Sequence, residues 1–324
     1  MHDENGRHDG VPPDSANPQD SFTDQIASPP VAPPRRFDWA ALGRILLWVA
    51  ISFFLPGPIL FALRRWLPLN ITEFRIGLLL PREIILFLCV LLATWIVGRL
   101  EHRKVGDYGL PLREAFKSRF WEGIFWGFAM QSVVLFLVWA IGDFHVDSLA
   151  LHGQSILAFA LGWGLFFIFV GLFEEFQFRG YAQFAFAKAR GFWIAAVLLS
   201  LLFGAAHLGN PGENPLGIVQ VVEIALVFCL ALWRTGNLWF AVGMHAAWDW
   251  AETYFFGVAD SGLLGVGRLL NTSFHGSKWI TGGSAGPEGS VVALLVILIA
   301  GYFVHLRFPE VKYPLRYFQG SSPQ

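Results

Sequence analysis

Charged residues are scarce in this sequence, at 15% of the chain, against roughly 25% in an average soluble domain. Hydrophobic residues make up 55%, which is more apolar surface than one water-soluble globule can bury. The formal net charge is −1, so no field of one sign indicates a nucleic-acid partner. Low charge and high hydrophobicity together favour an integral membrane protein.

Cysteine is also rare. Cys89 and Cys229 both lie in apolar runs, which argues against a structural disulfide and indicates small buried side chains. The sequence has no His-Glu-x-x-His zinc helix, so hydrolytic chemistry of that kind is excluded.

Beyond a Pro/Asp-rich start, apolar stretches of about 20 residues recur, as transmembrane helices require. We predict an all-α fold, a polytopic bundle of about eight transmembrane helices. Pro56 and Pro58 predict a kink or split in the first helix, and Pro81 interrupts the start of the second. The predicted spans are approximately 42–63, 76–98, 120–141, 155–174 and beyond, 192–208, 216–233, 238–257 and 291–306.

The predicted organisation has three parts. Residues 1–38 form a disordered cytoplasmic tail, because they are too polar to offset their ordering entropy. The transmembrane bundle covers 39–310, and 311–324 form a short cytoplasmic tail. Lys and Arg gather in the loops on the side of the termini, which predicts a multi-pass protein of the plasma membrane with both termini cytoplasmic.

Ionisable residues within the predicted spans form three clusters. A charged group at membrane depth is energetically costly, so each cluster is a candidate functional site. The clusters are Phe173-Glu-Glu-Phe-Gln-Phe-Arg179, Phe203-Gly-Ala-Ala-His207 and His245-Ala-Ala-Trp-Asp249. Each contains a pair of residues four positions apart, which share one helix face.

Counting along the predicted helices places the clusters at a similar depth. With a turn between the fourth and fifth spans near residues 190–191, Glu174 and His207 each lie 16 residues from it. Asp249 lies 13 residues beyond the turn at Gly236, on the order of 20 Å along a helix. We therefore expect these side chains to meet inside the bilayer, where polar groups need partners.

Taken singly, each cluster has a structural explanation. An acidic pair before an arginine can be an interfacial ion pair, and a lone buried histidine is more often a helix–helix hydrogen bond than a ligand. Their coincidence at one depth favours a site. Gln220 and Glu223 could line the same cavity or bond to a neighbouring helix, and Glu252 is expected at the outer rim.

In these three runs the sequence resembles the CAAX-protease and bacteriocin-processing (CPBP, or Abi) family of intramembrane endopeptidases, which includes the type II CAAX prenyl proteases. The family pattern is Glu-Glu-x-x-x-Arg, then Phe-x-x-x-His, then His-x-x-x-Asn or Asp, and all three occur here in order. The resemblance covers about residues 157–256, within a predicted core at about 155–257. It implies hydrolysis of a peptide bond in a membrane-associated or lipidated substrate.

The resemblance also implies a role for each matching residue. Glu174 would be the general base that activates water, with Glu175 and Arg179 as structural or electrostatic helpers. A carboxylate in a low-dielectric cavity suits that role. The implied catalytic set is Glu174, Glu175, Arg179, His207, His245 and Asp249.

Two alternatives stay open for the histidines. His207 would position the water or bind a metal, and His245 with Asp249 would stabilise the oxyanion or complete a metal site. A zinc ion held by Glu174, His207 and His245 matches the ligand types of catalytic zinc sites, and a metal-free site suits the residues equally. Asp249 cannot donate to an oxyanion unless protonated, which favours a metal-binding or histidine-orienting role.

The sequence leaves two other functions open. A non-catalytic relative would bind a membrane protein or a regulator through the same cavity. A proton-coupled transporter would also use buried Glu, His and Asp side chains. Transport predicts flux without cleavage, and the binding relative predicts that Glu174→Gln is silent.

Overall fold

A computed structural model describes residues 38–67, 74–210 and 212–314 of the 324-residue chain. The predicted disordered tail up to residue 37, and residues 315–324 of the predicted C-terminal tail, lie outside the described residues. The predicted bundle lies within them, apart from 68–73 and 211.

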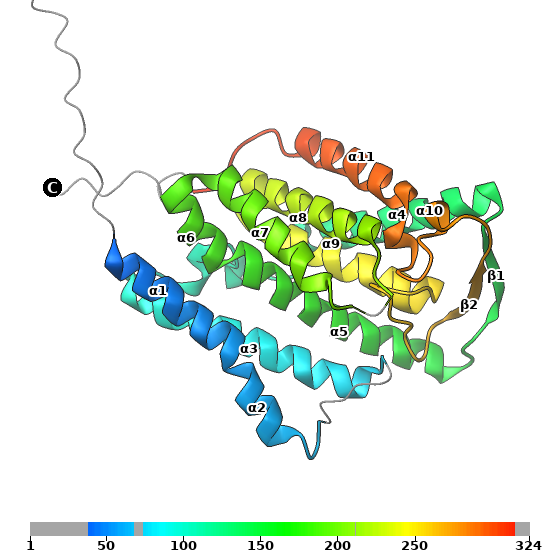
Figure 1. The fold of residues 1–324 in the computed structure, drawn as a ribbon, viewed down its shortest axis with the longest axis horizontal. Helices are drawn as coiled ribbons and strands as arrows, with labels where there is room; N and C mark the ends of the chain where they lie inside the picture. The colour runs from blue at the N-terminus through cyan, green and yellow to red at the C-terminus, as the bar shows by residue number, and fades with distance from the viewer. Residues whose placement is uncertain (1–37, 68–73, 211, 315–324) are drawn as a thin grey trace, which may run out of the picture. The chain divides into compact units, whose positions relative to one another are not determined.

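The described chain is a bundle of apolar helices, and every predicted span is helical over most of its length (Figure 1). The helices are α1 (Trp39–Val49), α2 (Pro56–Leu63), α3 (Ile76–Leu100), α4 (Ser118–Ile141), α5 (Gln154–Arg179), α6 (Tyr181–Arg190), α7 (Phe192–His207), α8 (Pro215–Thr235), α9 (Trp239–Trp250), α10 (Lys278–Thr281) and α11 (Val291–Arg307). Five helical stretches are long and apolar enough to cross a membrane, and α7 and α11 are shorter apolar helices. The predicted polytopic helical bundle is confirmed.

The first predicted span is split, as its prolines indicated. A π-helical turn at Ala50–Phe54 separates α1 from α2, which begins at Pro56. Proline has no N–H to donate, so the regular helical hydrogen bonds break there. In contrast, α3 runs through Pro81 without interruption.

Short elements in the loops were not predicted. Strands β1 (Phe144–Leu149) and β2 (Leu270–Phe274) form an antiparallel pair, with Phe144 opposite Phe274. Helical 3-10 turns occur at Val105–Tyr108, Leu112–Glu114 and Pro287–Gly289. Because these elements lie between the apolar spans, hydropathy gave no signal for them.

Helix α9, which carries two of the motif residues, packs closely against α4 and also against α5. A Cβ at Gly127 of α4 would collide with the carbonyl oxygen of Met244 on α9. The missing side chain lets the two backbones approach, as small residues do between membrane helices. Beyond Trp250, α9 continues as a π-helical turn at Ala251–Phe256.

The long predicted helix ending near residue 190 is broken at Gly180. This residue has ψ −128°, outside the helical region, and a Cβ on it would collide with the carbonyl oxygen of Phe176. Helix α6 therefore turns away from the axis of α5 (Figure 1). The depth estimate that counted residues back from the turn near Arg190 assumed one straight helix, and that assumption was wrong.

Candidate active site

The end of α5 divides its two acidic residues between two environments. The Glu174 side chain is 24% exposed, whereas the adjacent Glu175 side chain is fully buried. Neighbouring residues of a helix project about 100° apart, so one carboxylate lines a cavity and the other lies behind its wall. The two carboxylates therefore have different functions available to them.

Glu175 connects two other motif residues. Its Oε1 lies 3.4 Å from Nη1 of Arg179 and 2.9 Å from Nδ1 of His245. The Arg179 side chain is fully buried, with its guanidinium 4.4 Å from the centre of the Phe203 ring. A buried charge needs such partners, so the ion pair orients His245 and joins α5 to α9.

His245 directs its other nitrogen toward the cavity. Nε2 lies 3.6 Å from Oε2 of Glu174 and 3.4 Å from Oδ2 of Asp249, one turn further along α9. The ring stacks on Phe228, with 5.5 Å between centroids and 10° between planes. Glu175 and Phe228 thus hold the imidazole with Nε2 between two carboxylates.

His207 ends α7 on the opposite wall. Its Nδ1 lies 2.8 Å from the carbonyl oxygen of Phe203. Because a carbonyl oxygen only accepts, this nitrogen carries the hydrogen. In the neutral ring, Nε2 is then a free acceptor, and the side chain is half-buried at the cavity.

The four residues Glu174, His207, His245 and Asp249 line one cavity of about 500 Å³. Three helices, α5, α7 and α9, supply them. The structure thus brings these four residues together, and Arg179 and Glu175 support them from outside the cavity wall. Such a cavity with few convergent polar groups is typical of a ligand or substrate site.

Sequence reasoning missed three acidic residues in the same cavity. Glu83 of α3, Asp260 after α9 and Glu288 before α11 also line it. Glu83 could have been identified from the sequence, because it is an ionisable residue within an apolar span, the criterion that identified the other clusters. Asp260 and Glu288 lie in glycine-containing loops with no periodicity, so only the fold shows that both are buried.

Two further expectations concern residues near the cavity. Gln220 lines the cavity, which was one of the two alternatives predicted for it; the other was a bond to a neighbouring helix. Glu252 was expected at the outer rim, and that was wrong. Its side chain is fully buried, and its Oε1 accepts from Nε2 of Gln131 at 2.9 Å, because the π-helical turn after Trp250 keeps it inside the bundle.

A Gly-x-Ser-x-Gly run at 282–286 does not form a nucleophile elbow. Ser284 lies in the loop after α10 rather than between a strand and a helix, which the elbow requires. Its Oγ donates to the carbonyl oxygen of Gly212 at 2.7 Å. The serine therefore has a structural role in closing two loops.

The carboxyl groups of Asp260 and Glu288 have raised pKa values. Burial is the main cause for both, and the charge of nearby Asp249 adds to it. The two groups need a proton or a cation to offset their charge.

The donor set expected for zinc fits only in part. The Nδ1 atoms of His207 and His245 bond to an oxygen acceptor, as those of metal-binding histidines do. Among the described residues, however, Glu174, His207 and His245 are not a set whose ligand atoms all lie within 4.8 Å of one another. We therefore derive no catalytic step through a metal.

A comparison with protein families supports the resemblance seen in the motifs. Residues 156–251 match the family described as type II CAAX prenyl endopeptidase Rce1-like. Searches of curated proteins and of solved structures found no match. The matched segment contains all three motifs, so the predicted resemblance is confirmed there. Residues 156–251, which are less than half of the chain, are thus similar to a family of type II CAAX prenyl endopeptidases.

Proposed function

We propose that this protein hydrolyses a peptide bond in a membrane-associated or lipidated peptide or protein, with Glu174 activating the water. One observation carries the proposal. The Glu174 carboxylate and the Nε2 atom of His245 lie 3.6 Å apart in a cavity that His207 also lines. A general base with two imidazoles around one space can activate water and stabilise an oxyanion, which are the two tasks in hydrolysis of an amide.

Glu174 is the general base. Its side chain is partly exposed to the cavity, so it can reach a water molecule there. The carboxylate takes one proton from the water as the oxygen attacks the carbonyl carbon of the peptide. The proton then passes to the amine nitrogen as the C–N bond breaks, which leaves one carboxylic acid and one amine product.

His207 positions the water. Its Nδ1–H bonds to the carbonyl oxygen of Phe203, so Nε2 can accept the second hydrogen of the water. Two acceptors, this nitrogen and the Glu174 carboxylate, would hold the water oxygen with its lone pair toward the substrate.

His245 stabilises the oxyanion in its imidazolium form. Glu175 accepts from Nδ1 at 2.9 Å and holds the ring, and Asp249 lies on the Nε2 side at 3.4 Å. Asp249 acts through His245, since a carboxylate would repel the oxyanion directly. This assignment makes Glu175 and Asp249 positioning residues.

The membrane location of the substrate follows from the helices that surround the cavity. Apolar helices α3, α5, α7, α8 and α9 all contribute to its lining. This lining supports a substrate that enters from within or beside the bilayer. We also propose the plasma membrane as the location. The distribution of Lys and Arg supports the orientation that we propose, with both termini on the cytoplasmic side.

The proposal is tested with full-length protein in lipid nanodiscs. Wild type and Glu174→Gln are incubated with prenylated peptides and with bacteriocin-leader peptides, and products are identified by mass spectrometry. Glu310→Gln is the matched control, because Glu310 is 74% exposed and pairs with Lys312. We expect cleavage by wild type and the control, and a loss of about 10²-fold or more in Glu174→Gln.

Equal cleavage by wild type and Glu174→Gln would contradict the proposal. Elemental analysis of the same purified protein, with and without chelator, tests the zinc alternative. Bound zinc together with loss of cleavage in chelator would replace the metal-free mechanism.

A further inference from the structure

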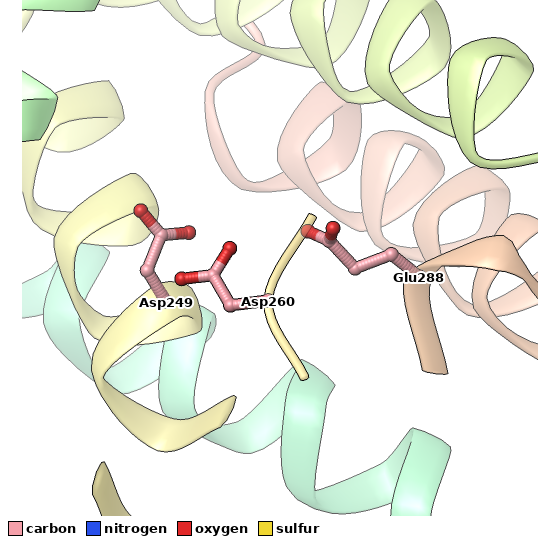
Figure 2. A group of neighbouring side chains, drawn as sticks. All are labelled: Asp249, Asp260 and Glu288. Carbon is pink, nitrogen blue, oxygen red and sulfur yellow. The ribbon is translucent and has the colours of Figure 1, made fainter. Parts of the chain in front are cut away.

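Three buried carboxylates meet at the end of the cavity beyond His245. Asp249 comes from α9, Asp260 from the loop that follows it, and Glu288 from the 3-10 turn before α11 (Figure 2). One oxygen from each lies within 4.8 Å of the others, and all three residues are buried. Three like charges at this separation repel strongly in a low-dielectric site.

Neutral groups are the main partners of this cluster. Asp260 accepts from Oγ1 of Thr253 at 3.0 Å. Glu288 accepts from Nε1 of Trp248 at 3.1 Å and from the backbone N–H of Ser261 at 3.0 Å.

In the part of the chain that the structure describes, no Lys or Arg pairs with any of the three carboxylates. Asp249 has a single ionisable partner, His245, at 3.4 Å. Arg82 lines the same cavity, and it is exposed. One imidazole cannot offset three ionised carboxylates, so the cluster needs either added protons or a bound cation.

A further oxygen that lines the cavity lacks a hydrogen-bond donor. Gln220 is 1% exposed and lines the same cavity, and its Oε1 has no hydrogen-bond partner among the described residues. Helix α8, which carries it, packs against the turn that carries Glu288. A buried amide oxygen without a donor is energetically costly, unless a ligand supplies the missing contact.

Glu252 adds a fourth buried carboxyl group to this region. Its side chain is 0% exposed, interacts electrostatically with all three carboxylates and lies in hydrogen-bond contact with Glu288. One of its oxygens is held by Gln131. The unpartnered oxygen of Gln220 is independent of the spacing of the cluster, and it indicates a missing electropositive ligand.

We infer that Asp249, Asp260 and Glu288 bind a hard divalent cation, Ca²⁺ in preference to Mg²⁺. The donors are carboxylate and amide oxygens, which suit Ca²⁺, Mg²⁺ or Mn²⁺ rather than Zn²⁺ or Cu²⁺. Ca²⁺ accepts several carboxylate and amide oxygens in a flexible geometry, whereas Mg²⁺ usually keeps several water ligands and is seldom held by protein oxygens alone. Because this cluster is buried and lined by protein oxygens, it favours Ca²⁺.

The cation would link parts of the chain that are distant in sequence. It would join the end of α9 to the loop after it and to the turn before α11, closing one end of the cavity. It would also hold Asp249, which lies beside His245. The inference does not depend on peptide cleavage, because its readout is binding of the cation.

The test measures binding of ⁴⁵Ca²⁺ by equilibrium dialysis to the purified full-length protein after chelator treatment. We expect about one saturable site below roughly 1 mM Ca²⁺, and binding of Mg²⁺ at least about tenfold weaker. Asp260→Asn and Glu288→Gln should each weaken Ca²⁺ binding by about tenfold or more. Asp147→Asn is the control, because Asp147 lies exposed on β1, where it accepts a hydrogen bond from Ser273.

Thermal unfolding without Ca²⁺ checks that each variant is folded. If Glu288→Gln does not fold, Asp260→Asn alone tests Ca²⁺ binding. Added Ca²⁺ should raise the midpoint of wild type and not that of Asp260→Asn. Absence of saturable Ca²⁺ and Mn²⁺ binding to wild type, or wild-type affinity in Asp260→Asn, would overturn the inference. Glu174→Gln separates the two proposals, since it should lose cleavage and keep Ca²⁺ binding.

Discussion

Oε1 of Glu175 lies 2.9 Å from Nδ1 of His245 and 3.4 Å from Nη1 of Arg179. One carboxylate oxygen thus joins a buried guanidinium to the imidazole that faces the cavity. Glu175 and Arg179 of the Glu-Glu-x-x-x-Arg motif are therefore coupled to His245 of the His-x-x-x-Asp motif through a single atom. Changes at either end should be transmitted to the other.

Removing the Arg179 guanidinium should leave the buried Glu175 carboxylate without its ion-pair partner. In Arg179→Met, the fully buried Glu175 loses its cationic partner, and we expect the free energy of unfolding to fall by about 3–5 kcal/mol. The double variant Glu175→Gln with Arg179→Met should recover much of this loss, because no unpaired charge remains. Unfolding in detergent measures both, and additive effects of the two substitutions would contradict the coupling.

His207 should affect the chemical step more than binding. His207→Ala removes the acceptor proposed for the water, and we expect kcat to fall by about 10²-fold or more with KM little changed. His152→Ala is the control, because His152 lies in an exposed loop. A rise in KM at constant kcat would instead indicate a role in substrate binding.

Asp249 lies in both the proposed active site and the proposed cation site. Asp249→Asn keeps an oxygen that can accept from His245 and loses one negative charge. We expect cleavage to stay within about tenfold of wild type, and Ca²⁺ affinity to fall by about tenfold or more. Equilibrium dialysis and cleavage assays on one preparation of Asp249→Asn measure both quantities. Equal losses of Ca²⁺ affinity and of cleavage would contradict separate roles for Asp249.

Close packing of α4 on α9 should be sensitive to a single methyl group. Gly127→Ala places a Cβ against the carbonyl oxygen of Met244, so we expect a loss of about 1–3 kcal/mol in stability. Gly77→Ala is the matched control, since a Cβ there meets nothing within 4 Å. Equal midpoints of thermal unfolding for the two variants would show that α4 can shift without penalty.

Much of the bundle could be predicted because its signals are local. Apolar runs near bilayer length identified the helices, and the i,i+4 pairs identified the faces that carry Glu175 and His245. The break at Gly180 has no such signal, since glycine is common in membrane helices. The depth argument that ignored this break was wrong in its premise, although Glu174 and His207 do line one cavity.

Asp260 and Glu288 were not predictable for a different reason. Acidic residues in loops between apolar spans are ordinarily solvated. Their burial depends on how the loops after α9 and before α11 fold back over the cavity, which is a tertiary relationship. The same holds for Glu252, whose burial follows from the π-helical turn and the contact with Gln131.

The π-helical turn at Ala251–Phe256 makes the length of the chain critical at one place. Such a turn accommodates one residue more than an α-helical turn would. Deleting a single amino acid there would tighten the turn into regular helix and rotate everything downstream by about 100° relative to Asp249. Point substitutions on this segment are therefore milder perturbations than the loss of one codon.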